Sequence, residues 1–118
     1  MSNIEHNLRH VDASMLDGLK ELLGDRFVLL IEQYLADCSA RIARIEPALA
    51  CDDLLVVKNE AHGLKGSCRN IGANALAQIC ADIEDRARFG EAVGLQQKFA
   101  DVQQEFAAVS HELETLIR

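Results

Sequence analysis

Residues 54–72 read LLVVKNEAHGLKGSCRNIG, and the spacing inside this stretch decides the fold. Its apolar residues recur every three or four positions, so they lie along one stripe of a helix. They are Leu54, Val57, Ala61, Leu64, Cys68 and Ile71. Gly72 follows the stripe, and a glycine there commonly ends a helix because it tolerates a left-handed backbone. The stretch therefore predicts one amphipathic helix, with Asp52 or Asp53 as its N-terminal cap.

The same spacing occurs in segments on both sides of this helix. It predicts a short helix at residues 14–23, a long helix from 27 to 49 capped by Asp25, and two further helices at 76–87 and 95–116. Pro47 interrupts the long helix near its end. Because proline lacks a backbone donor and clashes with the preceding turn, we expect a kink or break there.

The predicted helices pack in one economical way. Each long helix has a single apolar stripe and only short loops separate the helices, which favours an antiparallel arrangement with the stripes facing inward. We therefore predict an all-α fold, an antiparallel up-down four-helix bundle with an additional short N-terminal helix. One domain should cover residues 1–118, with residues 1–12 forming a flexible or frayed segment.

Composition excludes several classes of function. The formal net charge of −7 argues against binding to nucleic acid or to anionic membranes, which reward a basic surface. No apolar run approaches the roughly 20 residues of a membrane span, and the polar N-terminus lacks a secretory signal. A cytoplasmic location is expected.

The cysteines form no C-x-x-C pair, and Cys38, Cys68 and Cys80 fall on apolar stripes, which predicts reduced thiols in the core.

A cationic strip with one imidazole is predicted on the helix at 54–71. At about 100° per residue, its four members fall within a sector of roughly 60°, beside the apolar stripe. They are Lys58, His62, Lys65 and Arg69. Gly63 and Gly66 lie on the same helix away from the stripe, and each should cost about 1 kcal/mol relative to alanine. Core packing does not explain them, and Gly66 leaves the imidazole uncovered because it is one turn beyond His62.

An exposed imidazole beside cations suits phosphoryl transfer through a histidine nucleophile. Lys65 and Arg69 are candidates for offsetting the phosphoryl charge. The chain has no Gly-rich phosphate loop of the G-x-x-x-x-G-K-[ST] kind, no G-x-S-x-G and no H-E-x-x-H motif. The pattern therefore indicates a carrier without kinase activity of its own, which binds no cofactor or metal and depends on another protein for them.

The motif A-H-G-L-K-G-S at residues 61–67, continued by Asn70-Ile71-Gly72 and Leu76, resembles the histidine phosphotransfer (HPt) domain family of phosphorelays. The resemblance implies that His62 is phosphorylated on Nε2 and exchanges the group with an aspartate of a receiver domain, which brings the Mg²⁺. It also implies that Lys65 neutralises the phosphoryl group and that Gly66 keeps the site open.

Further residues follow from the same resemblance. Glu84 matches a position from which related domains hydrogen-bond the histidine ring. Lys58, Gly63, Ser67 and Arg69 are candidates for partner docking. Gly63 and Arg69 depart from the family pattern, which often has a small polar residue at the first position and a smaller residue at the second, so Arg69 should narrow the choice of partner.

The predicted function is that of a monomeric phosphorelay protein that takes a phosphoryl group from the receiver domain of a hybrid sensor kinase and passes it to a response regulator. The alternative is a helical adaptor that binds signalling partners without phosphorylation. The two differ in chemistry, because an adaptor should keep its function when His62 is replaced by glutamine.

Overall fold

The computed structural model describes residues 8–118, which contain five α-helices and no β-strand. The helices are α1 (Ala13–Leu23), α2 (Arg26–Ala50), α3 (Leu54–Ile71), α4 (Asn74–Arg88) and α5 (Leu95–Leu116). The predicted all-α class is confirmed for this part of the chain. None of the helices in residues 8–118 combines the length and hydrophobicity needed to cross a membrane.

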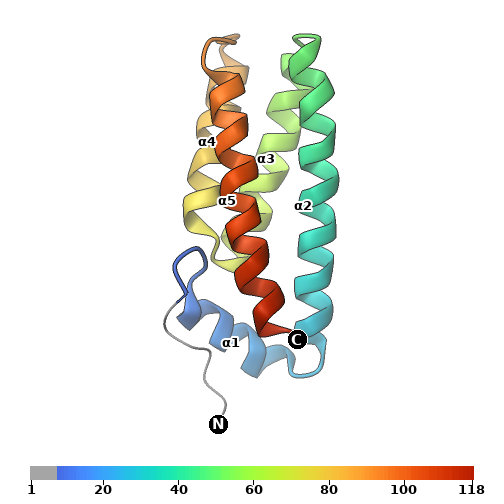
Figure 1. Ribbon diagram of the computed structural model, residues 1–118, viewed down its shortest axis with the longest axis vertical. Coiled ribbons are helices and arrows are strands. Elements are labelled where there is room, and N and C mark those ends of the chain that lie inside the picture. Colours follow the sequence, from blue (N-terminus) through green and yellow to red (C-terminus); the bar gives the residue numbers. More distant parts are fainter. Residues whose placement is uncertain (1–7) are drawn as a thin grey trace.

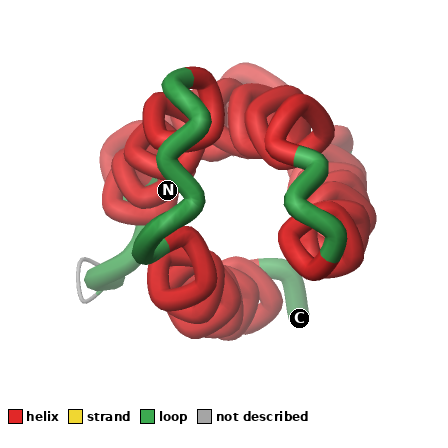
Figure 2. Tube along the Cα trace, turned by 90° about the horizontal axis from the view of Figure 1, so that it is seen from above, coloured by secondary structure: helices red, strands yellow, loops and turns green. Residues whose placement is uncertain are grey.

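The four long helices lie side by side along the long axis of the molecule, and α1 crosses beneath one end (Figure 1). Seen along that axis, α2 to α5 surround a common centre (Figure 2). The molecule measures 49 × 22 × 19 Å. Helix α3 packs against α2 on one side and α4 on the other, while α5 contacts α4 and α2. His62 therefore belongs to a helix with a neighbour on each flank.

Helix ends largely follow the predicted caps. Of the two candidates for α3, Asp53 is the cap, because its carboxylate accepts the backbone N–H of Val56 at 3.3 Å. Gly72 adopts the left-handed conformation, with φ of 84°, and ends α3 as expected. Asp25 occupies the N-cap position of α2, as predicted, but its side chain makes no capping hydrogen bond.

Pro47 does not break α2, contrary to our expectation. The helix continues through it and ends three residues later at Ala50. Proline removes one hydrogen bond of the helix, and burial of Ile45, Ala48 and Leu49 around it holds the backbone helical. The Pro47 carbonyl still accepts the N–H of Cys51 at 3.2 Å.

The N-terminal segment differs from the predicted flexible or frayed state over residues 8–12, while residues 1–7 lie outside the described part. The Glu112 carboxylate of α5 accepts the backbone N–H of Arg9 at 2.8 Å and that of His10 at 2.9 Å. The N–H of Asp12 donates to the Gly72 carbonyl at 3.0 Å. These bonds hold the segment before α1 against α5 and against the end of α3. They also satisfy backbone N–H groups that lie outside any helix.

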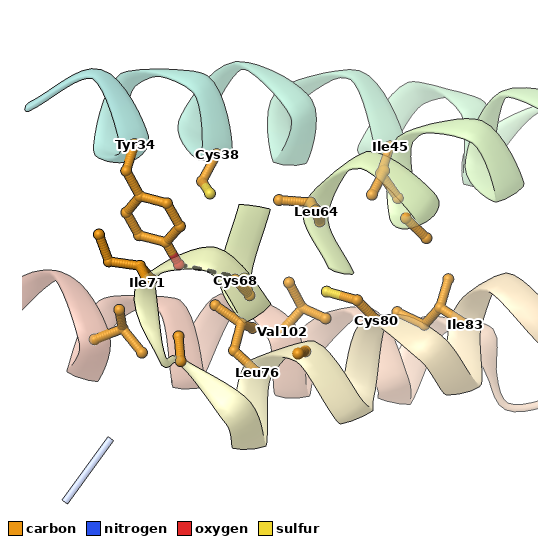
Figure 3. Close-up of a cluster of buried hydrophobic side chains, with 14 of the residues drawn as sticks. Tyr34, Cys38, Ile45, Leu64, Cys68, Ile71, Leu76, Cys80, Ile83 and Val102 are labelled. Atoms are coloured by element: carbon orange, nitrogen blue, oxygen red, sulfur yellow. Dashed lines mark hydrogen bonds between the residues drawn. The ribbon is translucent and has the colours of Figure 1, made fainter. Parts of the chain in front are cut away.

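The core contains the three cysteines that the apolar stripes predicted. Cys38, Cys68 and Cys80 are buried and free, whereas Cys51 is exposed. Figure 3 shows Cys38 and Cys68 near Tyr34, whose hydroxyl lies 3.2 Å from the Cys68 sulfur, and Cys80 farther along the core near Ile83. Burial raises the pKa of the Tyr34 phenol, so it stays neutral and fills the core with its hydrogen bond satisfied.

Candidate functional site

His62 lies on the outer surface of α3 and makes one hydrogen bond to its neighbours. Its side chain is 68% exposed, and Nδ1 lies 2.9 Å from Oε2 of Glu84 on α4. Glu84 is itself 4% exposed and is the one buried charged residue within residues 8–118. An exposed ring is thus held from one side by a buried carboxylate, as the resemblance implied for this position.

The Glu84 carboxylate is stabilised in its charged form. Burial by itself raises its pKa, but hydrogen bonds and charge from Lys65 and His62 outweigh that effect and lower the pKa below the ordinary value. An ionised carboxylate can only accept hydrogen bonds, so Nδ1 of His62 must carry the proton. In the neutral form of the ring, Nε2 is then the nitrogen with the free lone pair and so the nucleophilic atom.

Two cations converge on the same carboxylate. Lys65 on α3 places Nζ 2.6 Å from Oε1 of Glu84, and its side chain is 20% exposed. Arg88 on α4 places a guanidinium nitrogen 3.0 Å from Oε2 and is 50% exposed. Lys65, one turn from His62, is therefore kept beside the ring by the carboxylate that the ring also contacts.

Arg88 was missed by the sequence analysis. Its signal was present, because Glu84 and Arg88 are four residues apart on one helix and side chains at that spacing meet. An acidic residue followed by a basic one at this spacing is common on exposed helix surfaces, so the pair did not stand out until α4 was placed beside His62.

The opposite flank of His62, toward α2, is built around Gly63. A Cβ atom at this glycine would lie 2.2 Å from a guanidinium nitrogen of Arg41, so the missing side chain makes room for that group. Gly63 is therefore explained by contact with a surface arginine and not by core packing. Arg41 donates to Asp37 at 3.1 Å and to Glu60 at 3.1 Å.

The other predicted site residues are spread along the same helix. A Cβ at Gly66 would meet no atom within 4 Å, so the surface next to the imidazole is open. Ser67 faces α2, where its hydroxyl donates to Asp37 at 3.4 Å. Lys58 is half-buried and Arg69 is exposed, and they were predicted to dock a partner. Residues 8–118 contain no group of three or more metal-binding side chains.

Comparison with known proteins identifies the family. The family model described as Hpt domain matches residues 29–118. The chain belongs to the Hpt domain family. The matched range includes His62, Lys65, Gly66 and Glu84, so the whole predicted motif of this Hpt domain lies inside it.

Two relatives of this Hpt domain carry descriptive names. The phosphorelay protein LuxU of Vibrio vulnificus is 30% identical over 74 residues, in both strain YJ016 and strain CMCP6. That alignment covers 63% of this chain and 64% of LuxU, which is less than two thirds of LuxU's length. The crystal structure of histidine-containing phosphotransfer protein B (HptB) from Pseudomonas aeruginosa PAO1 superposes with a TM-score of 0.89 and 29% identity. The structural alignment covers 92% of this chain and 94% of the HptB chain.

The geometry of this Hpt domain permits one kind of chemistry at His62. The exposed ring has Nδ1 held by Glu84, so Nε2 carries the lone pair when the ring is neutral, and a lysine lies beside it. Together these groups form a nucleophile next to a positive charge.

Proposed function

We propose that this Hpt domain accepts a phosphoryl group on Nε2 of His62 from an aspartate of a receiver domain and passes it to the aspartate of a response regulator. The observation that carries the proposal is the 2.9 Å contact between Nδ1 and Glu84, which leaves Nε2 as the free nucleophile on an exposed ring. The Hpt family match and the likeness to LuxU and HptB support it.

The transfer step needs no proton movement in this chain. The Nε2 lone pair forms a bond to phosphorus while the bond from phosphorus to the aspartate oxygen breaks, and the aspartate leaves as a carboxylate. The proton on Nδ1 stays between His62 and Glu84, where the carboxylate balances the positive charge that develops on the ring. The receiver domain brings Mg²⁺, which offsets charge on the phosphoryl oxygens.

The chain's own residues then supply position and a local charge. Lys65 reaches Glu84 at 2.6 Å before transfer, and a short rotation of its long side chain brings the ammonium to a phosphoryl oxygen on the neighbouring ring. Arg88 stays on Glu84 and keeps that carboxylate compensated when Lys65 moves. Gly66 leaves room for the partner's backbone close to the imidazole.

The proposal includes the finer calls made from the sequence. It takes α2 to α5 as an antiparallel up-down four-helix bundle in one domain over residues 1–118, with no kinase activity of its own. Receiver domains of hybrid sensor kinases and response regulators are the partners. A monomeric state and a cytoplasmic location stay predictions.

Transfer from a radiolabelled, Mg²⁺-loaded receiver domain tests the function directly. The wild-type chain should acquire acid-labile, base-stable label, and His62→Gln should acquire none while keeping its helical content. Incubation of the wild type with labelled ATP alone should give no label, because the chain lacks a nucleotide loop. Failure of the wild type to take label from a broad panel of receivers would favour the adaptor function instead.

A further inference from the structure

Arg41 on α2 lies across the backbone of α3 at Gly63, the residue next to His62 in sequence. Two guanidinium atoms of Arg41 would lie 2.2 and 2.4 Å from a Cβ at this position, so no other residue type fits without displacing the arginine. The absence of a side chain at Gly63 therefore leaves space that the Arg41 side chain of α2 occupies. The position is occupied by a charged group rather than left as an open surface.

The guanidinium is held in place by two carboxylates. Nε donates to Asp37 at 3.1 Å, and Nη1 donates to Glu60 at 3.1 Å. Glu60 also accepts a hydrogen bond from Nε of Arg44 at 2.7 Å. A side chain fixed in this way loses little conformational entropy when a partner covers it, which is the usual obstacle to using a long flexible residue at an interface.

Arg41 still has donors to offer. A guanidinium carries five N–H groups, and within residues 8–118 the bonds to Asp37 and Glu60 engage two of them. Its side chain is 29% exposed, so water reaches part of it. A partner that excludes this water must supply oxygen acceptors, because a buried donor without an acceptor is costly.

Any partner that reaches His62 must cover this group. A specific interface buries about 800 Å² on each protein, which extends well beyond the residues adjacent to a reacting atom. Arg41 contacts the backbone position next to His62, so it falls inside such a footprint. Lys65 and Arg88 lie on the other flank of α3 and do not replace it.

We propose that Arg41 is a partner-recognition residue, seated by Gly63, whose free N–H groups bind oxygen acceptors on the receiver-domain surface beside the reacting aspartate. The inference rests on the phosphotransfer function proposed above and adds to it a residue that selects the receiver. Its effect belongs to the binding step, because the chemistry at Nε2 depends on the opposite flank.

The test uses single-turnover transfer from a phosphorylated receiver domain that labels the wild type, measured over a range of Hpt concentrations. Arg41→Ala should raise the half-saturating concentration roughly tenfold, typical for an arginine at an interface, and leave the maximal rate close to wild type. Arg26→Ala removes the same charge from the far end of α2, about 22 Å away at 1.5 Å per residue, and should behave like wild type.

Gly63→Ala provides the second variant. The new methyl group displaces only the flexible end of Arg41, and alanine favours a helix more than glycine, so the thermal midpoint should stay the same or rise. Its half-saturating concentration should increase as in Arg41→Ala, and the double variant should be no worse than Arg41→Ala alone. Additive losses would show that Gly63 does not act through Arg41.

The outcomes separate the two proposals. A wild type that takes no label refutes the proposed function whatever the variants do. A labelled wild type with an unchanged half-saturating concentration in Arg41→Ala overturns the recognition role alone. A lower maximal rate at an unchanged half-saturating concentration also overturns it, because that result assigns Arg41 to the transfer step.

Discussion

The two flanks of His62 are built alike, with a carboxylate contacted by two cations on each side of α3. On the α4 flank, Lys65 and Arg88 meet at Glu84. On the α2 flank, Arg41 and Arg44 meet at Glu60. Each cluster joins α3 to a neighbouring helix, so both contribute to the position of the helix that carries the imidazole.

The difference lies in what the carboxylate touches. Glu84 is buried and contacts the ring at Nδ1, whereas Glu60 holds an arginine that lies against a glycine backbone. The first cluster can change the reactivity of His62, and the second can change only the surface that a partner meets. The comparison therefore divides the site into a flank for chemistry and a flank for recognition, and the following predictions test that division.

The largest effect is expected when the two carboxylates are removed in turn. Glu84→Ala should slow transfer about a hundredfold, since the ring loses the group that fixes its tautomer and orientation. It should also lower the free energy of unfolding by about 3 kcal/mol, because removal of the buried carboxylate leaves Lys65 without its partner. Glu60→Ala should leave the maximal rate unchanged. Equal losses of rate in the two variants, measured by single-turnover transfer, would contradict the assignment of chemistry to one flank and recognition to the other.

Lys65→Ala tests the chemical flank without removing the carboxylate. It should slow transfer roughly thirtyfold. This is less than the largest losses seen when an oxyanion-stabilising group is removed, because in the proposed mechanism Mg²⁺ of the receiver offsets part of the charge. The fold should survive, since Arg88 and His62 still compensate Glu84. Lys58→Ala, on the same helix, is the matched control and should have a smaller effect. An unchanged rate in Lys65→Ala would remove this lysine from the mechanism.

Gly66→Gln tests the surface between the flanks. The new side chain should cover the imidazole and weaken receiver binding about tenfold, while stability rises by a few tenths of a kcal/mol from the better helix propensity. Gly18→Gln in α1 is the control, because a Cβ there also meets nothing within 4 Å. It should show the gain in stability and normal binding by titration calorimetry. Normal binding in Gly66→Gln would contradict an open docking surface.

Acid pH should weaken both flanks. The pKa of Glu84 is lowered because Lys65 and His62 outweigh its burial, and that of Glu60 is lowered by the Arg44 hydrogen bond against the opposing effect of burial. A depressed pKa in the folded state gives stability that is complete above about pH 5 and is lost as pH falls through the folded value. Glu84→Gln and Glu60→Gln should each flatten the decline of the urea midpoint below about pH 5. A decline as steep as in wild type would show that neither carboxylate drives acid unfolding.

The smallest effect is expected outside both flanks, at Asp52. This residue joins α2 to α3 with a φ of 56°, a conformation that glycine adopts without strain. Asp52→Gly should raise the unfolding free energy by about 0.5–1 kcal/mol and leave the transfer kinetics unchanged. Chemical denaturation with parallel kinetics gives both values. A change in transfer rate would mean that α3 itself had shifted, and the two flanks could then not be compared independently of stability.

Sequence patterns were sufficient for the parts of the structure that are local. The three-four spacing from Leu54 to Ile71 specified α3, and the left-handed Gly72 ended it where expected. Apolar stripes also identified the buried cysteines. Of the kink or break expected at Pro47, the break was wrong, because burial of Ile45, Ala48 and Leu49 holds the backbone helical on both sides of the proline.

The site was predicted where the family motif supplied the residues, and it was missed at contacts between helices that the motif does not include. His62, Lys65 and Glu84 lie together as the resemblance implied. Arg41 could not be found, because its contact with Gly63 exists only once α2 lies against α3 at this register. The hydrogen bonds from the backbone of Arg9 and His10 to Glu112 could not be predicted either. The two partners lie about a hundred residues apart, and no local sequence pattern reports such a contact.

The packing of Tyr34 gives the molecule an optical reporter that needs no label. It is the only tyrosine, the chain has no tryptophan, and its phenol is buried against Cys68. Because burial raises the pKa of this phenol, alkaline solution should not ionise it while the helices stay packed. The ultraviolet absorbance of tyrosinate should therefore appear only when the core opens. Every variant can thus be checked for an intact interior by its absorbance in alkaline solution, before any receiver domain is added.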